Sequence, residues 1–301
     1  MSAQPAAALP PSRLRRLRTR RASRTRSRSA WRQPTMVAGL AIAAIWIVVA
    51  IFAPLLAPHD PLAQDFAITQ APSGAHPFGT DELGRDVLSR VLVAARHSLP
   101  LAVLLVVLAG SIGTTLGVLA GYVGGWIDGV VMRLADLVSS FPAIVLAMVV
   151  TASLGPSTRN AVLALVIVSW PIYARVVRSL VLSISQAEYV QAFRLHGASA
   201  RRAMRKEVLP NVVGPVTVLV TIYLADALLL LAGLSFLGLG TQPPTPEWGS
   251  MVSVGTQYFQ NWWMATFPGL AIFSAVLAFN FIGDGLRDVF DPQSSFRGDD
   301  A

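Results

Sequence analysis

The chain has 301 residues, of which 53% are hydrophobic and only 13% are charged, and it contains no cysteine. A soluble domain carries about a quarter of charged residues, so this composition indicates a membrane protein. The lack of cysteine excludes disulfides, thiolate nucleophiles, cysteine-ligated zinc and iron–sulfur clusters. The net charge of +8 would favour nucleic-acid binding only if the positive charges formed a face of a folded domain.

The positive charge is instead concentrated at the N-terminus. Residues 1–32 hold ten arginines and no acidic residue, and they are rich in Pro, Ser and Ala. Such a segment buries too little apolar area to order itself, so we expect a disordered tail. Because an apolar stretch follows directly, the arginines favour a cytoplasmic tail rather than RNA or anionic-lipid binding. That apolar stretch is too long for a cleaved export signal, and we expect no nucleic-acid partner.

Six apolar segments are long enough to cross a bilayer. The first has 21 uncharged residues, and at 1.5 Å per residue it crosses a hydrocarbon layer of about 30 Å. Aromatic residues at headgroup level are expected just before the last one, at Tyr258, Trp262 and Trp263. The predicted spans are 37–57, 98–122, 137–154, 161–174, 212–239 and 265–283.

The loops agree with an even number of crossings and two cytoplasmic termini. Residues 175–206 carry seven basic residues and one acid, whereas residues 58–97 carry three arginines and five acids. The positive-inside rule therefore places residues 175–206 in the cytoplasm and residues 58–97 outside. In the outer loop, Asp86 and Arg90 are four residues apart, and we expect residues 78–91 to form an amphipathic helix on the outer membrane face. Its role would be membrane anchoring or the seating of an external protein.

A four-residue glycine repeat begins in the second span. Gly113, Gly117 and Gly121 would form a smooth stripe on one helix face, where a second backbone can approach closely. The alternative is that glycine is simply common in transmembrane helices.

Ionisable residues inside the spans are few. Asp226 is the one well within a span, and it is either a carboxylate facing the translocation path or a structural hydrogen-bond acceptor. Arg133 and Asp136 lie three residues apart near a span end, and we expect them to form an interfacial ion pair.

Enzyme motifs are absent. The single lysine, Lys206, does not lie in a Walker A motif, and no G-x-S-x-G or H-E-x-x-H pattern occurs. The four histidines include no pair three or four residues apart. We therefore expect no catalytic residue, no metal site and no cofactor bound by this chain.

The basic loop after the fourth predicted span contains a short helix. Ser185 and Glu188 have the spacing of a capping box, and Gly197 is a typical helix stop. A second short helix should begin at Ser199 and end at residues 209–210. Four residues of the first helix share one apolar and aromatic face, namely Tyr189, Ala192, Phe193 and His196. This face either packs on the protein's own helices or docks into the groove of another protein.

This loop resembles the EAA loop of permeases of bacterial binding-protein-dependent ABC importers, through Glu188, Ala192, Gly197 and residues 209–211. Residues 76–91 (HPFGTDELGRDVLSRV), 121–136 (GYVGGWIDGVVMRLAD) and 234–249 (LSFLGLGTQPPTPEWG) resemble the C-type subunit of the dipeptide/oligopeptide/nickel subfamily. Two positions depart from the family pattern: Phe193 replaces an alanine, and Leu231 replaces a frequent glutamate.

The resemblance implies an all-α, multi-pass membrane protein with the type I ABC importer permease fold, one N-terminal helix plus a five-helix core. Its implied parts are 33–97 with the first transmembrane helix, a transmembrane type-1 domain at 98–290, its coupling loop at 175–210 and a cytoplasmic tail at 291–301. The implied partners are a sister permease, two ABC ATPase subunits that hold ATP and Mg²⁺, and an external solute-binding protein. Glu188 to Gly197 would form the coupling helix against an ATPase, in the cytoplasmic (inner) membrane.

Two other functions stay open from the residues alone. A secondary active transporter would use Asp226 as an ion-coupling carboxylate, and a membrane-anchored assembly protein would share the docking helix without a transport path. Within the resembling subfamily, di- or oligopeptides, nickel complexes and other solutes are all possible cargoes.

Overall fold

The computed structural model of the chain describes residues 33–290, and its elements are helices. The predicted tails at 1–32 and 291–301 lie outside the described residues. Five helices are long and apolar enough to cross a membrane, or six if one bent pair counts as a single span. The all-α, multi-pass prediction is therefore confirmed. The elements are α2 (Pro34–Leu56), α3 (Val87–Val123), α4 (Gly125–Ser139), α5 (Ala143–Leu154), α6 (Thr158–Ser185), α7 (Glu188–Leu195), α8 (Ala200–Ala203), η1 (Met204–Val208), α9 (Leu209–Phe236), α10 (Trp248–Gly255) and α11 (Trp263–Phe290).

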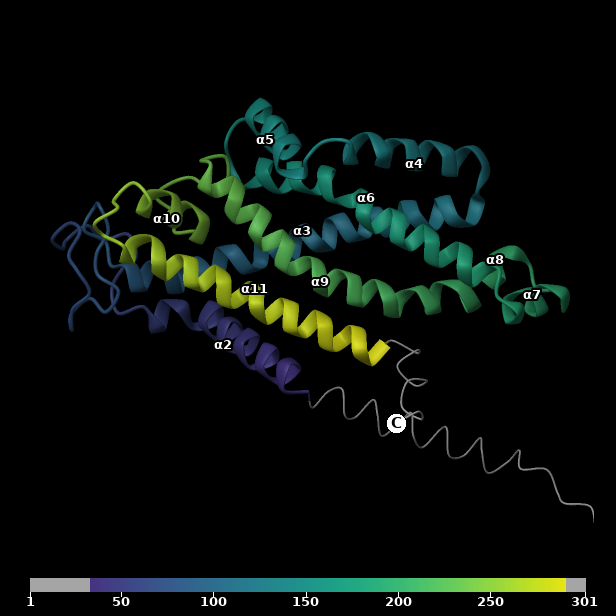
Figure 1. Cartoon of the computed structure of the whole chain (residues 1–301), viewed down its shortest axis with the longest axis horizontal. Coiled ribbons are helices and arrows are strands. Elements are labelled where there is room, and N and C mark those ends of the chain that lie inside the picture. Colours follow the sequence, from purple (N-terminus) through teal and green to yellow (C-terminus); the bar gives the residue numbers. More distant parts are fainter. Residues whose placement is uncertain (1–32, 291–301) are drawn as a thin grey trace, which may run out of the picture.

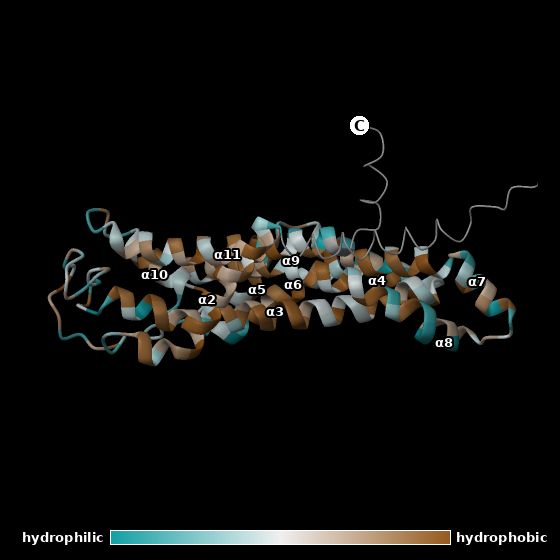
Figure 2. Cartoon of the chain, turned by 90° about the horizontal axis from the view of Figure 1, so that it is seen from below, coloured by the Kyte–Doolittle hydropathy of each residue, from teal (hydrophilic) through white to brown (hydrophobic). Residues whose placement is uncertain are grey.

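The long helices run roughly along one axis and give the molecule two distinct ends (Figure 1). We call the end with residues 57–86 and α10 the α10 end, and the end with α7 and α8 the α7 end. Helix α3 has 37 residues and is roughly 55 Å long, so it extends beyond a hydrocarbon layer of about 30 Å. Figure 2 shows hydrophobic residues along much of the helix length, with many hydrophilic residues in the loops at the α10 end and around α7 and α8.

The pair α3 and α6 forms the centre of the bundle, and glycines let the two backbones meet. A Cβ atom added to Gly113 would lie 2.5 Å from the carbonyl oxygen of Trp170, and one added to Gly117 would lie 2.5 Å from that of Ala174. At Gly121 the same test gives 2.9 Å to the carbonyl oxygen of Arg178. The contact thus repeats every four residues on both helices, and a side chain on any of these three glycines would push the helices apart.

The third predicted span, 137–154, is not one straight helix. Its first residues belong to α4, and α4 and α5 meet at 89° across a short break. Pro142 lies in this break and is the N-cap residue of α5. Proline disfavours helical backbone in the residue before it and has no N–H to continue the ladder, which explains the bend. Hydropathy averages over such a break and does not detect it.

The predicted helix end at residues 209–210 is also wrong. Helix α8 continues through the π-helical turn η1 into α9, so residues Ala200–Phe236 form one long helical segment. In the π turn, the N–H of Leu209 donates to the carbonyl of Met204. Pro210 stands directly after this π turn and has no N–H to continue the ladder, so the local change from α to π hydrogen bonding accompanies the proline.

Candidate functional site

Helix α7 lies at one tip of the molecule and is fixed to the protein by one face (Figure 1). Val190 is 2% exposed and lies in a small hydrophobic core together with Val177 and Val181 of α6. Ala203, Met204, Val208 and Val212 of the segment leading into α9 complete this core. Buried contacts therefore join α7 both to α6 and to the segment that leads into α9.

The other side of α7 faces away from the protein. Leu195 is 87% exposed and Tyr189 is 49% exposed, and Ala192 and His196 are exposed as well. Phe193 is half-buried against the small core. The predicted face of Tyr189, Ala192, Phe193 and His196 is therefore divided: Phe193 packs on the chain itself, because it lies one turn after the buried Val190, and the other three stay available.

The ends of α7 differ from the predicted ones in one respect. Ser185 is the last residue of α6, and its Oγ is buried without a hydrogen-bond partner among the described residues. The N-cap residue of α7 is Ala187, which makes no side-chain cap bond, so the predicted capping box does not form. Helix α6 runs further than hydropathy indicates and takes the serine into its last turn. Gly197 has φ +87°, and its N–H donates to the carbonyl of Arg194, as expected of a residue after a helix end.

A cavity of about 590 Å³ opens between α3, the α4–α5 break, α6 and α9. Asp226 and Tyr223 of α9 line it together with Tyr173 and Arg175 of α6. Apolar side chains supply most of the remaining wall, including Leu105 of α3. A cavity of this size, apolar with a few polar groups, has the character of a small-molecule path.

Two ion pairs tie α4 to α6 beside this cavity. The Arg175 Nη2 lies 2.9 Å from Asp136 Oδ1, and Arg178 makes two hydrogen bonds to the Asp128 carboxylate. Asp136 thus pairs across helices with Arg175, and the predicted pair with Arg133 is wrong. Residues three apart on a helix are neighbours, but a long arginine from a packed helix competes successfully for the carboxylate.

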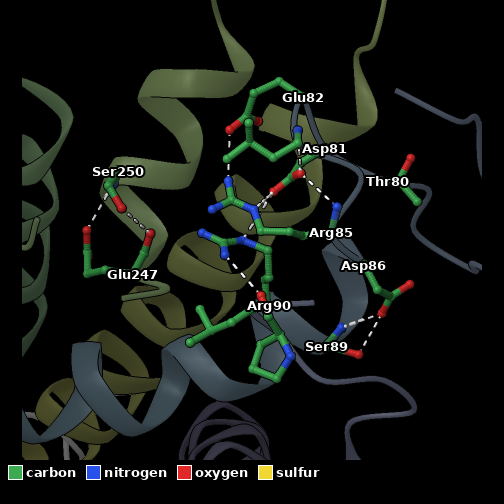
Figure 3. A network of polar contacts seen from close by, with 12 residues as sticks. Thr80, Asp81, Glu82, Arg85, Asp86, Ser89, Arg90, Glu247 and Ser250 are labelled. Carbon is green, nitrogen blue, oxygen red and sulfur yellow. Dashed lines mark hydrogen bonds and ion pairs between the residues drawn. The ribbon is translucent and has the colours of Figure 1, made fainter. Parts of the chain in front are cut away.

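The α10 end carries a network of buried charges (Figure 3). Asp81 Oδ2 lies 2.6 Å from Arg85 Nε and 3.4 Å from Arg90 Nε, and Arg85 also pairs with Glu82 at 2.8 Å. Asp81, Arg85 and Arg90 are each 6% exposed. Burial, the largest cause, raises the pKa of the Glu82 carboxyl. Paired buried charges of this kind hold a loop in one conformation.

The predicted amphipathic helix at 78–91 does not exist. Residues 78–86 form turns, and α3 begins only at Val87, with Asp86 as its N-cap residue accepting from the Ser89 N–H at 2.8 Å. Gly79 and Gly84 both have positive φ, which no helix provides. Two glycines five residues apart are a turn signal, and the i,i+4 spacing of Asp86 and Arg90 concealed it.

Glu247 is a functional group at this end that the sequence did not indicate. It is 3% exposed and is the N-cap residue of α10, where it accepts from the N–H groups of Gly249 and Ser250. The prediction for Trp263 is wrong: it is 6% exposed and donates to the carbonyl of Thr80, so it is a buried anchor and not part of an aromatic belt. Trp262 and Tyr258 stay exposed, as expected.

The sequence matches two families of membrane transport proteins. Residues 113–295 match the family described as "Binding-protein-dependent transport system inner membrane component". Residues 27–72 match the "N-terminal TM domain of oligopeptide transport permease C". Residues 73–112 lie between the two matches.

Curated relatives match most of the chain. It is 46% identical over 265 residues to the dipeptide transport system permease protein DppC of Escherichia coli K12, covering 85% of this chain and 88% of that protein. The probable D,D-dipeptide transport system permease protein DdpC of the same strain is 43% identical, covering 87% and 88%. The glutathione transport system permease protein GsiD of Escherichia coli strain 536 is 44% identical, covering 82% of each chain. The chain therefore belongs to the family of binding-protein-dependent transport system inner membrane components, the permeases of ABC importers.

Proposed function

We propose that this chain is one of two permease subunits that enclose the import path for di- or oligopeptides. Its partners are a sister permease, two ATPase subunits that hold ATP and Mg²⁺, and an external solute-binding protein. The family and the transport of dipeptides or glutathione by the named relatives support this proposal. The chain itself carries out no chemistry, because the ATPase subunits bind and hydrolyse the nucleotide. A secondary transporter is not favoured, because the family is one of ABC importer permeases.

The observation that carries the mechanism is the attachment of α7. Its exposed side, with Leu195 and Tyr189, is free to enter a groove on an ATPase, while Val190 fixes its other side to α6 and α9. Both of those helices line the cavity. Movement of the ATPase cleft therefore changes the cavity through two packed helices. ATP drives the change because it binds the two states of the complex with different affinity.

The proposal also implies an orientation in the membrane. The ATPases work in the cytoplasm, so the α7 end is cytoplasmic and the α10 end faces outward. The basic residues of the α7 end agree with the positive-inside rule, since Arg194, Arg201 and Arg202 lie on or beside α7. Both termini are then cytoplasmic.

Within the cavity, Asp226 is the group we assign to the cargo. Its side chain is exposed on the cavity wall, where a carboxylate attracts the ammonium group of a peptide N-terminus. An Asp226→Asn variant should weaken uptake of peptides with a free N-terminus more than uptake of N-acetylated ones. Equal effects on both would leave Asp226 with a structural role.

The coupling role is tested at Leu195 in the complete transporter, reconstituted in liposomes with its co-expressed partners. Leu195→Asp places a charge in the proposed groove and should lower ATP-driven uptake of a labelled dipeptide at least about tenfold, for a loss of about 1.4 kcal/mol or more. Leu195→Met keeps an apolar contact and should retain uptake. Membrane insertion should be equal for both, because Leu195 contacts little of its own chain.

The proposal fails if Leu195→Asp supports full uptake with normal ATP hydrolysis. A second variant, Gly197→Pro, removes the positive φ at the end of α7 and its N–H bond to Arg194. It should separate ATP hydrolysis from uptake or release the ATPases from the complex.

A further inference from the structure

Three side chains with metal-ligating atoms meet at the α10 end. They are His59, just after α2, His76 in the loop, and Asp86, the N-cap residue of α3. One ligand atom of each lies within 4.8 Å of the other two. The residues are 17 and 10 positions apart in the sequence, so no spacing motif predicts the cluster. The sequence alone therefore led us to expect no metal site, because tertiary contacts bring these residues together.

A shared serine positions two of the three groups. Asp86 Oδ2 accepts from the Ser89 N–H at 2.8 Å and from the Ser89 Oγ at 2.7 Å. The same Oγ accepts from the backbone N–H of His59 at 3.1 Å. These bonds occupy Oδ2 and leave Oδ1 directed at the cluster. Ser89 thus orients the Asp86 carboxylate and fixes the backbone of His59, and neighbours that orient a ligating carboxylate are typical of metal sites.

The third group, His76, is also held in place. Its carbonyl accepts from the N–H groups of Ser73 and Gly79, at 2.8 and 2.9 Å, which fixes the backbone of the turn. Its Nδ1 lies 2.9 Å from Asp86 Oδ1. Two ligands of one zinc ion, each about 2.1 Å from it, are about 3.0 to 3.4 Å apart for angles between 90° and tetrahedral. The two atoms are now at hydrogen-bond distance, and an ion that replaced the proton between them would require only a small increase in their separation.

The charge of the cluster favours a cation. Asp86 is fully buried, and among residues 33–290 its single ion-pair partner is His76. The neighbouring Arg85 and Arg90 are directed instead to Asp81 and Glu82. The carboxylate is hydrogen-bonded to Ser89 and His76 but has no arginine or lysine beside it, and a divalent ion would supply a positive charge there.

We propose that His59, His76 and Asp86 form a binding site for a divalent transition-metal ion of the zinc type. Two imidazoles and one carboxylate, with a fourth position left for water, are a donor set that zinc accepts. Phe66 covers the site, with its ring centroid 4.8 Å from that of His59 and 4.4 Å from that of His76. His59 is partly exposed and provides the entry. The bound ion joins the segment after α2 and the loop to the start of α3.

The test uses the full-length chain, purified in detergent with its co-expressed partners and without a polyhistidine tag. The chain has four histidines and no cysteine, so few competing zinc sites exist in it. Zn²⁺ is titrated against a chromophoric chelator, and Co²⁺ is added separately to record its visible absorption bands. We expect one saturable site in this chain, intense Co²⁺ bands of a four- or five-coordinate site, and a rise in the unfolding temperature on Zn²⁺ addition.

The variants His59→Gln and His76→Gln should each weaken Zn²⁺ binding at least about tenfold and remove the Co²⁺ bands. His97→Gln changes a histidine of α3 outside the cluster and should bind like the wild type. Because His59 is partly exposed, His59→Gln should keep the metal-free unfolding temperature, which separates loss of a ligand from loss of the fold.

Zn²⁺ bound by the partner subunits does not affect the comparison of variants with the wild type, because the partner subunits are identical in all preparations. The proposal is overturned if no Zn²⁺ site is lost on His59→Gln while the protein stays folded, or if Co²⁺ shows only the weak bands of the hydrated ion. Neither outcome bears on the identity of the transported solute, so the proposed function stands or falls separately.

Discussion

The two ends of the molecule are stabilised in different ways. At the α10 end, Asp81, Arg85 and Arg90 are all 6% exposed, and both arginines pair with Asp81. In the half of the molecule that leads to the α7 end, the pair between α4 and α6 is much more exposed, with side-chain exposures of 43% for Arg175 and 71% for Asp136. There, close backbone contact between α3 and α6 and one small hydrophobic core replace buried charge.

This difference separates a fixed end from an end built for a partner. Buried ion pairs specify one conformation of a long loop that has no regular secondary structure to hold it. An exposed Leu195 on a helix with only a small core beneath it gains most of its packing in a complex. The four predictions below test this comparison, and each is measured as thermal unfolding of the purified protein in detergent.

The largest effect is expected for Asp81→Ala. The substitution leaves Arg85 and Arg90 buried without their shared carboxylate, and removing one partner of a buried pair costs about 3–5 kcal/mol. Asp136→Ala breaks the exposed pair between α4 and α6 and should cost about 0–1 kcal/mol. Similar losses for the two variants would remove the distinction between the ends.

A smaller effect is expected at the α3–α6 contact. In Gly117→Ala the new methyl group would lie 2.5 Å from the Ala174 carbonyl oxygen and should cost about 1–3 kcal/mol through overpacking. Gly129→Ala in α4 meets no atom within 4 Å and should instead stabilise the helix by up to about 1 kcal/mol. If Gly117→Ala left the stability unchanged, the close approach of the α3 and α6 backbones would not be what stabilises this part of the molecule.

The third prediction concerns pH at the α10 end. Glu247 lies outside the candidate membrane spans, and burial raises the pKa of its carboxyl above the ordinary 4.5. The folded protein therefore binds this proton more tightly than the unfolded chain does, so the contribution of Glu247 to stability falls as pH rises from 4.5 through the raised pKa.

The side chain of the Glu247→Gln variant cannot titrate. As the pH rises from 4.5 through the raised pKa of Glu247, the unfolding temperature of the wild type should therefore fall relative to that of the variant. The variant also loses one cap acceptor, worth about 1 kcal/mol. A difference that is independent of pH would contradict the raised pKa.

The smallest effect is expected for Ser185→Ala. The hydroxyl is buried without a partner among the described residues, so its removal should change stability by less than about 0.5 kcal/mol, or improve it. Ser199→Ala removes a real N-cap acceptor of the Arg202 N–H and should cost about 1 kcal/mol. A loss of stability for Ser185→Ala as large as that for Ser199→Ala would indicate that the predicted capping box of Ser185 and Glu188 forms after all.

The sequence predicts the fold well where one physical term dominates. Long uncharged segments give the spans, because transfer of apolar helices into lipid outweighs local detail. The conformation of Gly197 and the glycine stripe of α3 also follow from single residues, since each has a backbone cause.

Prediction fails where tertiary partners compete with local patterns. Asp136 selects Arg175 rather than Arg133, and Ser185 joins α6 rather than capping α7. Residues 78–86 are shaped by ion pairs to the start of α3 and by Trp263 from the far end of the sequence, which no window of neighbouring residues contains. The division of α7 into a packed and a free side likewise depends on a core assembled from three segments.

The break between α4 and α5 has a consequence for the cavity. Helix α4 is joined to α3 through Gly124 and Gly125, which both have positive φ and where an added Cβ atom would meet nothing within 4 Å, and to α5 through the 89° bend. Between these two breaks, α4 is held to its neighbours by the buried side chains of Val131 and Ala135 and by the ion pairs of Asp128 and Asp136 with arginines of α6. The α3–α6 pair has no such break, so the two sides of the cavity differ: one is a closely packed helix pair and the other is a short helix between two bends.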